Sequence, residues 1–219
     1  MYRRIIAVGD IHGMWDRFAS LLSQMDYRPA EDFLIFLGDY IDRGPEPVRV
    51  LDWMMEHVEE GRLVALRGNH EQMLLDYGSS GGSEFSWLLN SGISPWQAVK
   101  KSFIPGWHRY LEFVRSLPCC YRLEANGKNY FFAHAGINPA KALDEQSEED
   151  LLWIRSEYYE QYQGKTVVVS GHTPVQFVGE GQSVPISKPH MIMLDTGSFM
   201  PEGHISAMDV ETREFWQSN

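Results

Sequence analysis

Residues 34–44, LIFLGDYIDRG, decide how the rest of the chain is interpreted. An apolar run ends at Gly38, and the next six residues include the carboxylates of Asp39 and Asp42 and the guanidinium of Arg43. This pattern predicts a buried strand that brings charged groups to the edge of a sheet, where α/β proteins bind ligands. A carboxylate can bridge two metal ions, and an arginine can bind phosphate with two hydrogen bonds. A strand followed by an ordinary polar turn has the same pattern, so this stretch alone leaves both interpretations open.

Two other short apolar runs end in polar clusters of the same kind. Residues 5–8 precede GDIHG at 9–13, and residues 63–66 precede RGNHE at 67–71. Each cluster is followed by apolar residues at helical spacing. One cluster alone means little, since a turn often contains an incidental Asp or His. Three successive strands with such ends indicate a parallel sheet, because parallel strands present their C-terminal ends at one edge.

The second half of the chain is richer in strand patterns. Residues 119–124 and 128–133 flank Asn126-Gly127, the strongest short signal for a hairpin, and further strands are expected at 166–170 and 191–194. Residues 204–210 and 213–216 are expected to form a closing hairpin that turns at 211–212. Residues 147–150 resemble a capping box that opens a helix carrying residues 151–155. Residues 84–117 are predicted to be a helical insert, whose apolar side chains are more often ordinary core than a substrate groove. We expect one α/β domain over residues 1–219, with two packed sheets and helices outside.

The composition limits the classes of function. A net charge of −11 argues against general binding to nucleic acid or to anionic membranes, so any phosphate site must be made positive locally. The only two cysteines are the adjacent Cys119 and Cys120, which seldom form a disulfide and fit a reducing compartment. The N-terminal apolar run is too short for a signal peptide, and no stretch approaches the roughly 20 residues of a membrane span. A cytoplasmic protein without a membrane partner is therefore expected.

Polar residues after the predicted strands form a plausible ligand set for metal ions. Four of the eight histidines lie in glycine-flanked turns, namely His12, His70, His134 and His172. With Asp10, Asp39 and Asn69 they offer oxygen and imidazole ligands without a thiolate, which favours Mn, Fe or Zn over a structural zinc cage. One carboxylate shared by two ions would hold them roughly 3.5–4 Å apart, the spacing used in two-metal phosphoester hydrolysis.

Five motifs, in this order, resemble those of the calcineurin-like metallophosphoesterases. They are GDIHG at 9–13, GDYIDRG at 38–44, GNHE at 68–71, HAG at 134–136 and GHT at 171–173. More narrowly, the chain resembles the phosphoprotein phosphatase branch, and its length and the LWIR segment at 152–155 resemble the small bacterial and phage-lambda-type serine/threonine protein phosphatases. The resemblance covers residues 9 to about 197 and implies a β-sandwich of two mixed sheets. The long substrate-facing loop of the eukaryotic members has no counterpart here, so their inhibitor binding is not carried over.

The resemblance implies a role for each matching residue. The implied metal ligands are Asp10 and His12 for one ion, Asp39 as the bridge, and Asn69, His134 and His172 for the second ion. Arg43 and Arg155 would bind the phosphate, although Arg155 rests on the LWIR segment alone. His70, kept protonated and oriented by Asp42, would give a proton to the leaving oxygen.

The resemblance also implies a reaction and a substrate class. Two divalent ions, with Mn the most expected and Fe or Zn also compatible, would lower the pKa of a bridging water so that hydroxide attacks phosphorus in line. The expected enzyme is a metallophosphatase that acts on phosphoserine and phosphothreonine in phosphoproteins or phosphopeptides. Symmetrical diadenosine tetraphosphatases share the motifs, so a dinucleoside polyphosphate is the alternative substrate. A catalytically inactive metal-binding scaffold is disfavoured, because every expected chemical position is occupied.

Overall fold

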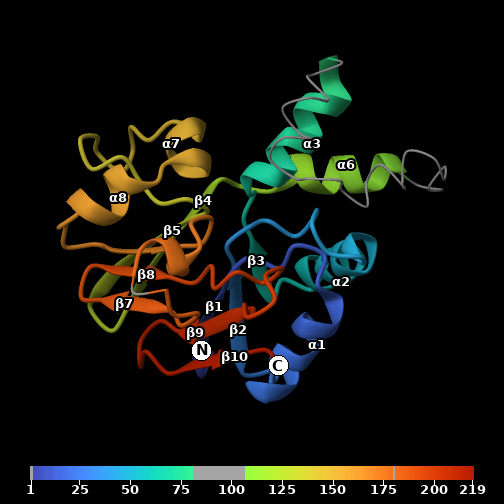
Figure 1. Cartoon of the computed structure of the whole chain (residues 1–219), viewed down its shortest axis with the longest axis horizontal. Coiled ribbons are helices and arrows are strands. Elements are labelled where there is room, and N and C mark those ends of the chain that lie inside the picture. Colours follow the sequence, from blue (N-terminus) through green and yellow to red (C-terminus); the bar gives the residue numbers. More distant parts are fainter. Residues whose placement is uncertain (1, 81–106, 180) are drawn as a thin grey trace.

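A computed structural model of the chain describes residues 2–80, 107–179 and 181–219. In these residues two five-stranded mixed sheets pack against one another, and helices lie on their outer faces (Figure 1). The predicted α/β class and the predicted pair of packed sheets are therefore confirmed.

The first sheet contains the three parallel strands expected from the sequence. Its order is β10-β9-β1-β2-β3, with bounds β1 (Arg4–Val8), β2 (Asp32–Phe36), β3 (Leu63–Ala65), β9 (Ser206–Asp209) and β10 (Phe215–Gln217). β1, β2 and β3 are parallel, so the segments that follow them meet at one edge. The C-terminal hairpin joins this sheet through antiparallel pairing of β9 with β1, so the two sheets do not correspond to the two halves of the sequence.

The second sheet has the order β4-β5-β6-β8-β7. Its strands are β4 (Cys120–Ala125), β5 (Lys128–Ala133), β6 (Val167–Ser170), β7 (Ile186–Lys188) and β8 (Met191–Met193). The predicted hairpin between β4 and β5 is confirmed, and its two turn residues Asn126 and Gly127 have φ of 48° and 72°. These values are those of a type I′ turn. The strand β7 was not predicted, because its three residues contain only one apolar side chain.

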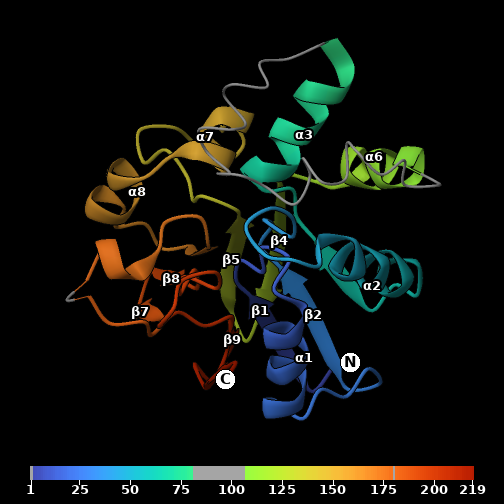
Figure 2. The same ribbon diagram turned by 45° about the vertical axis from the view of Figure 1, so that its right-hand side comes forward.

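Helices cover both outer faces (Figures 1 and 2). They are α1 (Trp15–Gln24), α2 (Pro47–Glu59), α3 (Asn69–Ser80), α6 (Trp107–Ser116), α7 (Glu148–Trp153) and α8 (Ser156–Gln161). Both views place α1 and α2 beside the first sheet and α7 and α8 at the opposite side. Residues 84–106 of the predicted insert lie outside the described residues, and the insert and the single-domain organisation remain predictions. No described helix is both long enough and apolar enough to cross a membrane.

Alternation along β1 fixes where the functional turns lie. Ile6 and Val8 point into the core between the first sheet and its helices, whereas Ala7 points into the core between the two sheets. A one-residue shift in pairing would exchange these two sets, which strongly disfavours other registers. The register therefore fixes the position of the residues that follow β1 relative to the residues that follow β2.

Candidate active site

The polar motifs form turns with an unusual backbone. Five non-glycine residues in them have positive φ, namely His12 at 50°, Asp39 at 56°, Asp42 at 67°, Arg43 at 68° and His172 at 64°. This conformation costs roughly 1–2 kcal/mol per residue for L-amino acids. Such strain persists only where surrounding contacts enforce it, and it tends to occur at functional sites.

Glu71 stabilises the turn that contains Asp39. Its buried carboxylate accepts hydrogen bonds from the backbone N–H groups of Asp39 at 2.8 Å, Tyr40 at 2.9 Å, Ile41 at 3.3 Å and Gly68 at 2.9 Å. Burial, together with the charge of Asp39, raises the pKa of Glu71 to about 7. The N–H donors act in the opposite direction and lower this pKa, because hydrogen bonds to a carboxylate favour its ionised form. Glu71 lies in the GNHE motif, but the motif resemblance implied no role for it.

Two motif glycines allow the main chain to approach carboxylates closely. A Cβ atom at Gly68 would collide with the side chain of Asp39 and would lie 2.7 Å from Oε2 of Glu71. A Cβ atom at Gly171 would collide with Oδ1 of Asp10. At both positions the absence of a side chain is required by packing.

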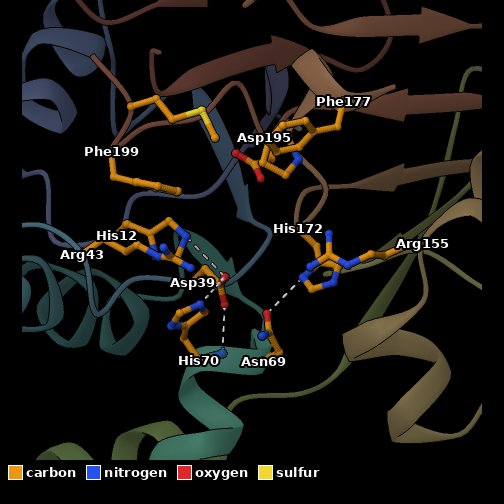
Figure 3. Close-up of a pocket in the computed structure, with 12 residues that line it drawn as sticks. His12, Asp39, Arg43, Asn69, His70, Arg155, His172, Phe177, Asp195 and Phe199 are labelled. Carbon is orange, nitrogen blue, oxygen red and sulfur yellow. Dashed lines mark hydrogen bonds and ion pairs between the residues drawn. The ribbon is translucent and has the colours of Figure 1, made fainter. Parts of the chain in front are cut away.

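Asp39 lies at the centre of the site (Figure 3). Its Oδ2 atom is 3.5 Å from Nε2 of His12 and 3.8 Å from Nε2 of His70, and its Oδ1 atom is 3.4 Å from Nε2 of His134. Two groups that could each hold a metal ion share this residue, and they are His12, Asp39 and His70, and Asp39, His134 and His172. The arrangement therefore offers two adjacent ion positions joined by one carboxylate.

Backbone carbonyls determine which nitrogen of two histidines is available. Nδ1 of His12 lies 3.0 Å from the carbonyl oxygen of Ile41, and Nδ1 of His134 lies 2.9 Å from that of Leu37. A carbonyl only accepts, so Nδ1 carries the proton and Nε2 keeps its lone pair. Burial lowers the pKa of His12 to about 4 and also lowers the pKa of His134. Both rings are therefore in the neutral form that binds metal.

The contacts of Asn69 fit a cation. Its Oδ1 atom lies 2.8 Å from Nε2 of His134 and 3.0 Å from Nδ1 of His172. The first contact joins two lone-pair atoms, because the proton of His134 is on Nδ1, and such atoms repel one another unless a cation lies beside both. Nε2 of His172 is buried and finds no hydrogen-bond partner among the described residues. The donor set thus has the chemistry of a metal site.

Asp10 and His70 each make contacts that the motifs alone did not indicate. Asp10 accepts hydrogen bonds from the backbone N–H of His172 at 3.2 and 3.1 Å, and in the described chain it belongs to neither ligand group. Burial and the charges of Asp195 and Asp39 raise the pKa of Asp10 well above its usual range. A nearby cation would relieve this unfavourable burial. His70, expected as the acid, also lies within one ligand group.

His70 is also paired with Asp42, as expected. Nδ1 of His70 lies 2.7 Å from Oδ2 of Asp42, and both side chains are buried. The backbone N–H of His70 donates to Oδ1 of Asp39 at 3.1 Å. Burial alone would lower the pKa of His70, but the charge of Asp39 and the hydrogen bond to Asp42 raise it overall. The pairing leaves Nε2 directed towards Asp39.

Arg43 and Arg155 lie on opposite sides of the cavity (Figure 3). The guanidinium of Arg43 lies 4.4 Å from the ring centroid of Phe199, and Nη1 of Arg155 donates to Oγ1 of Thr173 at 3.3 Å. The LWIR segment was expected to be helical, yet α7 ends at Trp153 and Arg155 is the N-cap residue of α8. The break turns the arginine towards the cavity.

The cavity has a volume of about 390 Å³ and is lined by several residues for which the motifs predict no role. These are Pro174, Phe177, Asp195, Phe199 and Met200. Asp195 follows β8, and its position after a strand was a usable signal. Burial raises the pKa of Asp195 to about 6. Phe177 and Phe199 lie in segments without a periodic pattern, so no comparable signal marks them in the sequence.

Two packed mixed sheets with a His/Asp/Asn site at the ends of their parallel strands define the class of metallophosphoesterases. Residues 3–202 match the calcineurin-like phosphoesterase family, and the chain belongs to this family. Its members are binuclear divalent-metal enzymes, which agrees with the two ligand groups around Asp39.

Several known proteins are similar over most of the chain. Serine/threonine-protein phosphatase 2 of Salmonella typhimurium is 29% identical over 96% of this chain and 94% of that protein. Serine/threonine-protein phosphatase 1 of the same organism is 30% identical over 80% of this chain and 81% of that protein. The symmetrical bis(5'-nucleosyl)-tetraphosphatase of Chromobacterium violaceum is 27% identical over 82% of this chain and 60% of that protein. The structure of a candidate diadenosine tetraphosphatase has a TM-score of 0.75 and 22% identity, covering 99% of this chain and 93% of that chain.

Proposed function

We propose that this chain is a serine/threonine protein phosphatase that works with two divalent metal ions, preferentially Mn²⁺. The observation that carries the proposal is the position of Asp39, which both ligand groups share in a cavity flanked by two arginines. The similarity to two bacterial serine/threonine phosphatases over most of both chains supports the substrate class.

The proposed metal ligands are those expected from the motifs. They are Asp10 and His12 for one ion, Asp39 for both ions, and Asn69, His134 and His172 for the other. Bound ions of this kind supply Lewis acidity and make water more acidic. The neutral imidazoles and the absence of a thiolate in this set suit Mn²⁺, and Fe or Zn also remain compatible.

The chain's own residues would bind the phosphate and assist the leaving group. The guanidinium groups of Arg43 and Arg155 neutralise the phosphoryl oxygens from two sides, which stabilises the charge distribution of the transition state. His70 donates a proton to the departing oxygen, and Asp42 holds its ring in place through the hydrogen bond to Nδ1.

The cavity favours a single phosphate over a polyphosphate chain. Among the described residues that line it, the fixed positive charges are those of two arginines, and no lysine contributes. Its volume of about 390 Å³ is at the small end of ligand pockets, which span about 300–1,000 Å³. A symmetrical dinucleoside tetraphosphatase remains the second candidate because a relative of that name aligns over most of this chain.

A cytoplasmic location is part of the proposal. Cys119 and Cys120 are both free thiols, which fits a reducing compartment.

Turnover of phosphoserine and phosphothreonine peptides, compared with turnover of diadenosine tetraphosphate, tests the function. We expect peptide hydrolysis with added Mn²⁺ and its loss after exhaustive chelation. Efficient cleavage of the dinucleotide with little peptide hydrolysis would favour the second candidate. Full activity without metal would exclude both.

A further inference from the structure

One side of the cavity is apolar, and nothing in the proposed chemistry uses it. We call it the apolar rim, and it consists of Pro174, Phe177, Phe199 and Met200. Figure 3 shows Phe199 and Phe177 on the same side of the cavity, separated from one another, with Asp195 between them. His70 and Asn69 lie on the opposite side in this view. The rim therefore lies across the cavity from the proposed acid His70.

Phe177 is unusually exposed for an aromatic residue. The residue is 73% exposed, more than any other exposed large hydrophobic residue in the described part of the chain. Of that exposed group, only Phe177 lines the cavity. Exposed apolar surface at the mouth of a cavity is typical of a binding surface.

Backbone contacts hold Phe177 in this position. It ends the short 3₁₀ helix η1 (Val175–Phe177), whose Val175 is buried. The backbone N–H of Val175 donates to the carbonyl oxygen of Asp195 at 2.9 Å. The side-chain amide of Gln176 donates to the carbonyl oxygen of Thr196 at 3.0 Å. The ring is thus presented by an anchored segment, which reduces the ordering cost of binding.

The other side of the rim is anchored as well. The Phe199 ring contacts Arg43 and lies edge-on to His12, with ring centroids 5.2 Å apart. Arg17 donates to the carbonyl oxygens of Ser198 and of Met200, the latter at 3.0 Å. Both sides of the rim are therefore preformed and continuous with the phosphate site.

We propose that the apolar rim binds an apolar side chain next to the phosphorylated residue of a peptide substrate. This inference rests on the proposed protein phosphatase function. A peptide fits better than a polyphosphate, because the carboxylate of Asp195 repels a second phosphate. Phe177 is then a specificity-determining residue that contacts the substrate outside the reacting group.

Two matched phosphoserine peptides test the rim, one with leucine on both sides of the phosphoserine and one with serine on both sides. We expect the wild type to prefer the leucine peptide by about tenfold in kcat/KM, an ordinary factor for apolar contacts in a pocket. Because such contacts bind ground state and transition state alike, the difference should lie mainly in KM. Phe177→Ala should remove most of this preference, and Phe177→Leu should retain most of it.

Two controls isolate the rim. Phe215→Ala removes another exposed phenylalanine, on β10 and outside the cavity lining, and should leave the preference unchanged. Inhibition by inorganic phosphate should be the same in wild type and Phe177→Ala, because Phe177 is not one of the residues proposed to bind phosphate.

The outcomes separate this inference from the proposed function. Equal hydrolysis of both peptides by the wild type, or an unchanged preference in Phe177→Ala, would overturn the proposed role of the rim. Either result would leave the proposed protein phosphatase function intact. No hydrolysis of either peptide, with rapid cleavage of diadenosine tetraphosphate, would overturn the protein phosphatase and the rim inference together.

Discussion

Asp39 has a strained backbone with positive φ and a buried side chain, and it belongs to both groups of possible metal ligands. Asp39→Asn keeps the size of the side chain but removes the charge that both ions would share. We expect loss of metal and a fall in kcat of at least about 100-fold, since even indirect supports of metal sites are typically worth 10–100-fold. Elemental analysis of the purified variant and peptide turnover measure the two effects. Near-normal metal content and rate would show that Asp39 is not a bridge.

His70 has two competing roles, since its Nδ1 pairs with Asp42 while its Nε2 faces Asp39. A serine alkoxide is a poor leaving group and needs protonation, whereas p-nitrophenolate leaves readily as an anion. General-acid catalysis is worth about 10²–10⁴-fold, so His70→Asn should lose most of that factor on phosphoserine peptides and distinctly less on p-nitrophenyl phosphate.

Metal analysis of the His70→Asn variant decides between these roles. Unchanged metal content, together with a larger loss of rate on the phosphoserine peptide than on p-nitrophenyl phosphate, supports His70 as the general acid. Equal losses of rate on the two substrates with the metal retained would show that His70 is not the general acid. Equal losses of rate with the metal missing would show that His70 is a metal ligand.

At the scale of elements, the turn between β3 and α3 tests how packing supports the site. An alanine at position 68 would push against Asp39 and Glu71. Overpacking of this kind typically costs about 1–3 kcal/mol, and the displaced Asp39 should also weaken metal binding. Chemical denaturation and metal titration of Gly68→Ala measure the two losses.

Gly61→Ala is the matched control for Gly68→Ala. Gly61 has φ of 68° after α2, and no heavy atom lies within 4 Å of a Cβ placed there. The control should cost only about 1–2 kcal/mol of stability. Equal metal affinity in the two variants would contradict the packing argument.

Local patterns predicted several elements well, for identifiable reasons. The runs before Asp10, Asp39 and Asn69 gave three parallel strands, and Asn126-Gly127 gave the hairpin. The predicted capping box before α7 is present, with Ser147 and Asp150 bonded reciprocally. These features depend on neighbours in sequence, so a sequence can specify them.

Other features depend on distant contacts and were missed. The helix α3 begins at Asn69, inside the motif rather than after it, where Glu71 is bound by the 39–41 turn. The position of Arg155 depends on where α7 ends. The position of Phe177 depends on the hydrogen bond from the backbone N–H of Val175 to the carbonyl oxygen of Asp195. The apolar rim could not be predicted, because its residues are brought together only by the packing of the second sheet.

At the scale of the whole molecule, the proposed ligands come from both sheets. Asp10, His12, Asp39 and Asn69 follow strands of the first sheet, and His134 and His172 follow strands of the second. Bound ions would therefore link the sheets and stabilise the folded chain.

Metal should raise the melting temperature accordingly. At 100 times its dissociation constant a ligand contributes about 2.7 kcal/mol, and 1 kcal/mol corresponds to about 2–4 °C for a chain of this size. We expect Tm to rise by about 5–10 °C on adding Mn²⁺ to chelated protein, with a much smaller rise in Asp39→Asn. The same Tm with and without metal would argue that the ions do not join the sheets.

The hydrogen bond between Asp10 and the N–H of His172 spans 162 residues and bears on how the protein is made. Ribosomes add about 5–20 residues per second, so roughly 5–20 s pass between synthesis of Asn69 and of His172. During that time the growing chain has acidic and imidazole side chains but no complete pair of ion positions. A growing chain that lacks His134 and His172 would therefore lack the proposed second ion position, and we expect no hydrolysis until both residues have been made and folded into place.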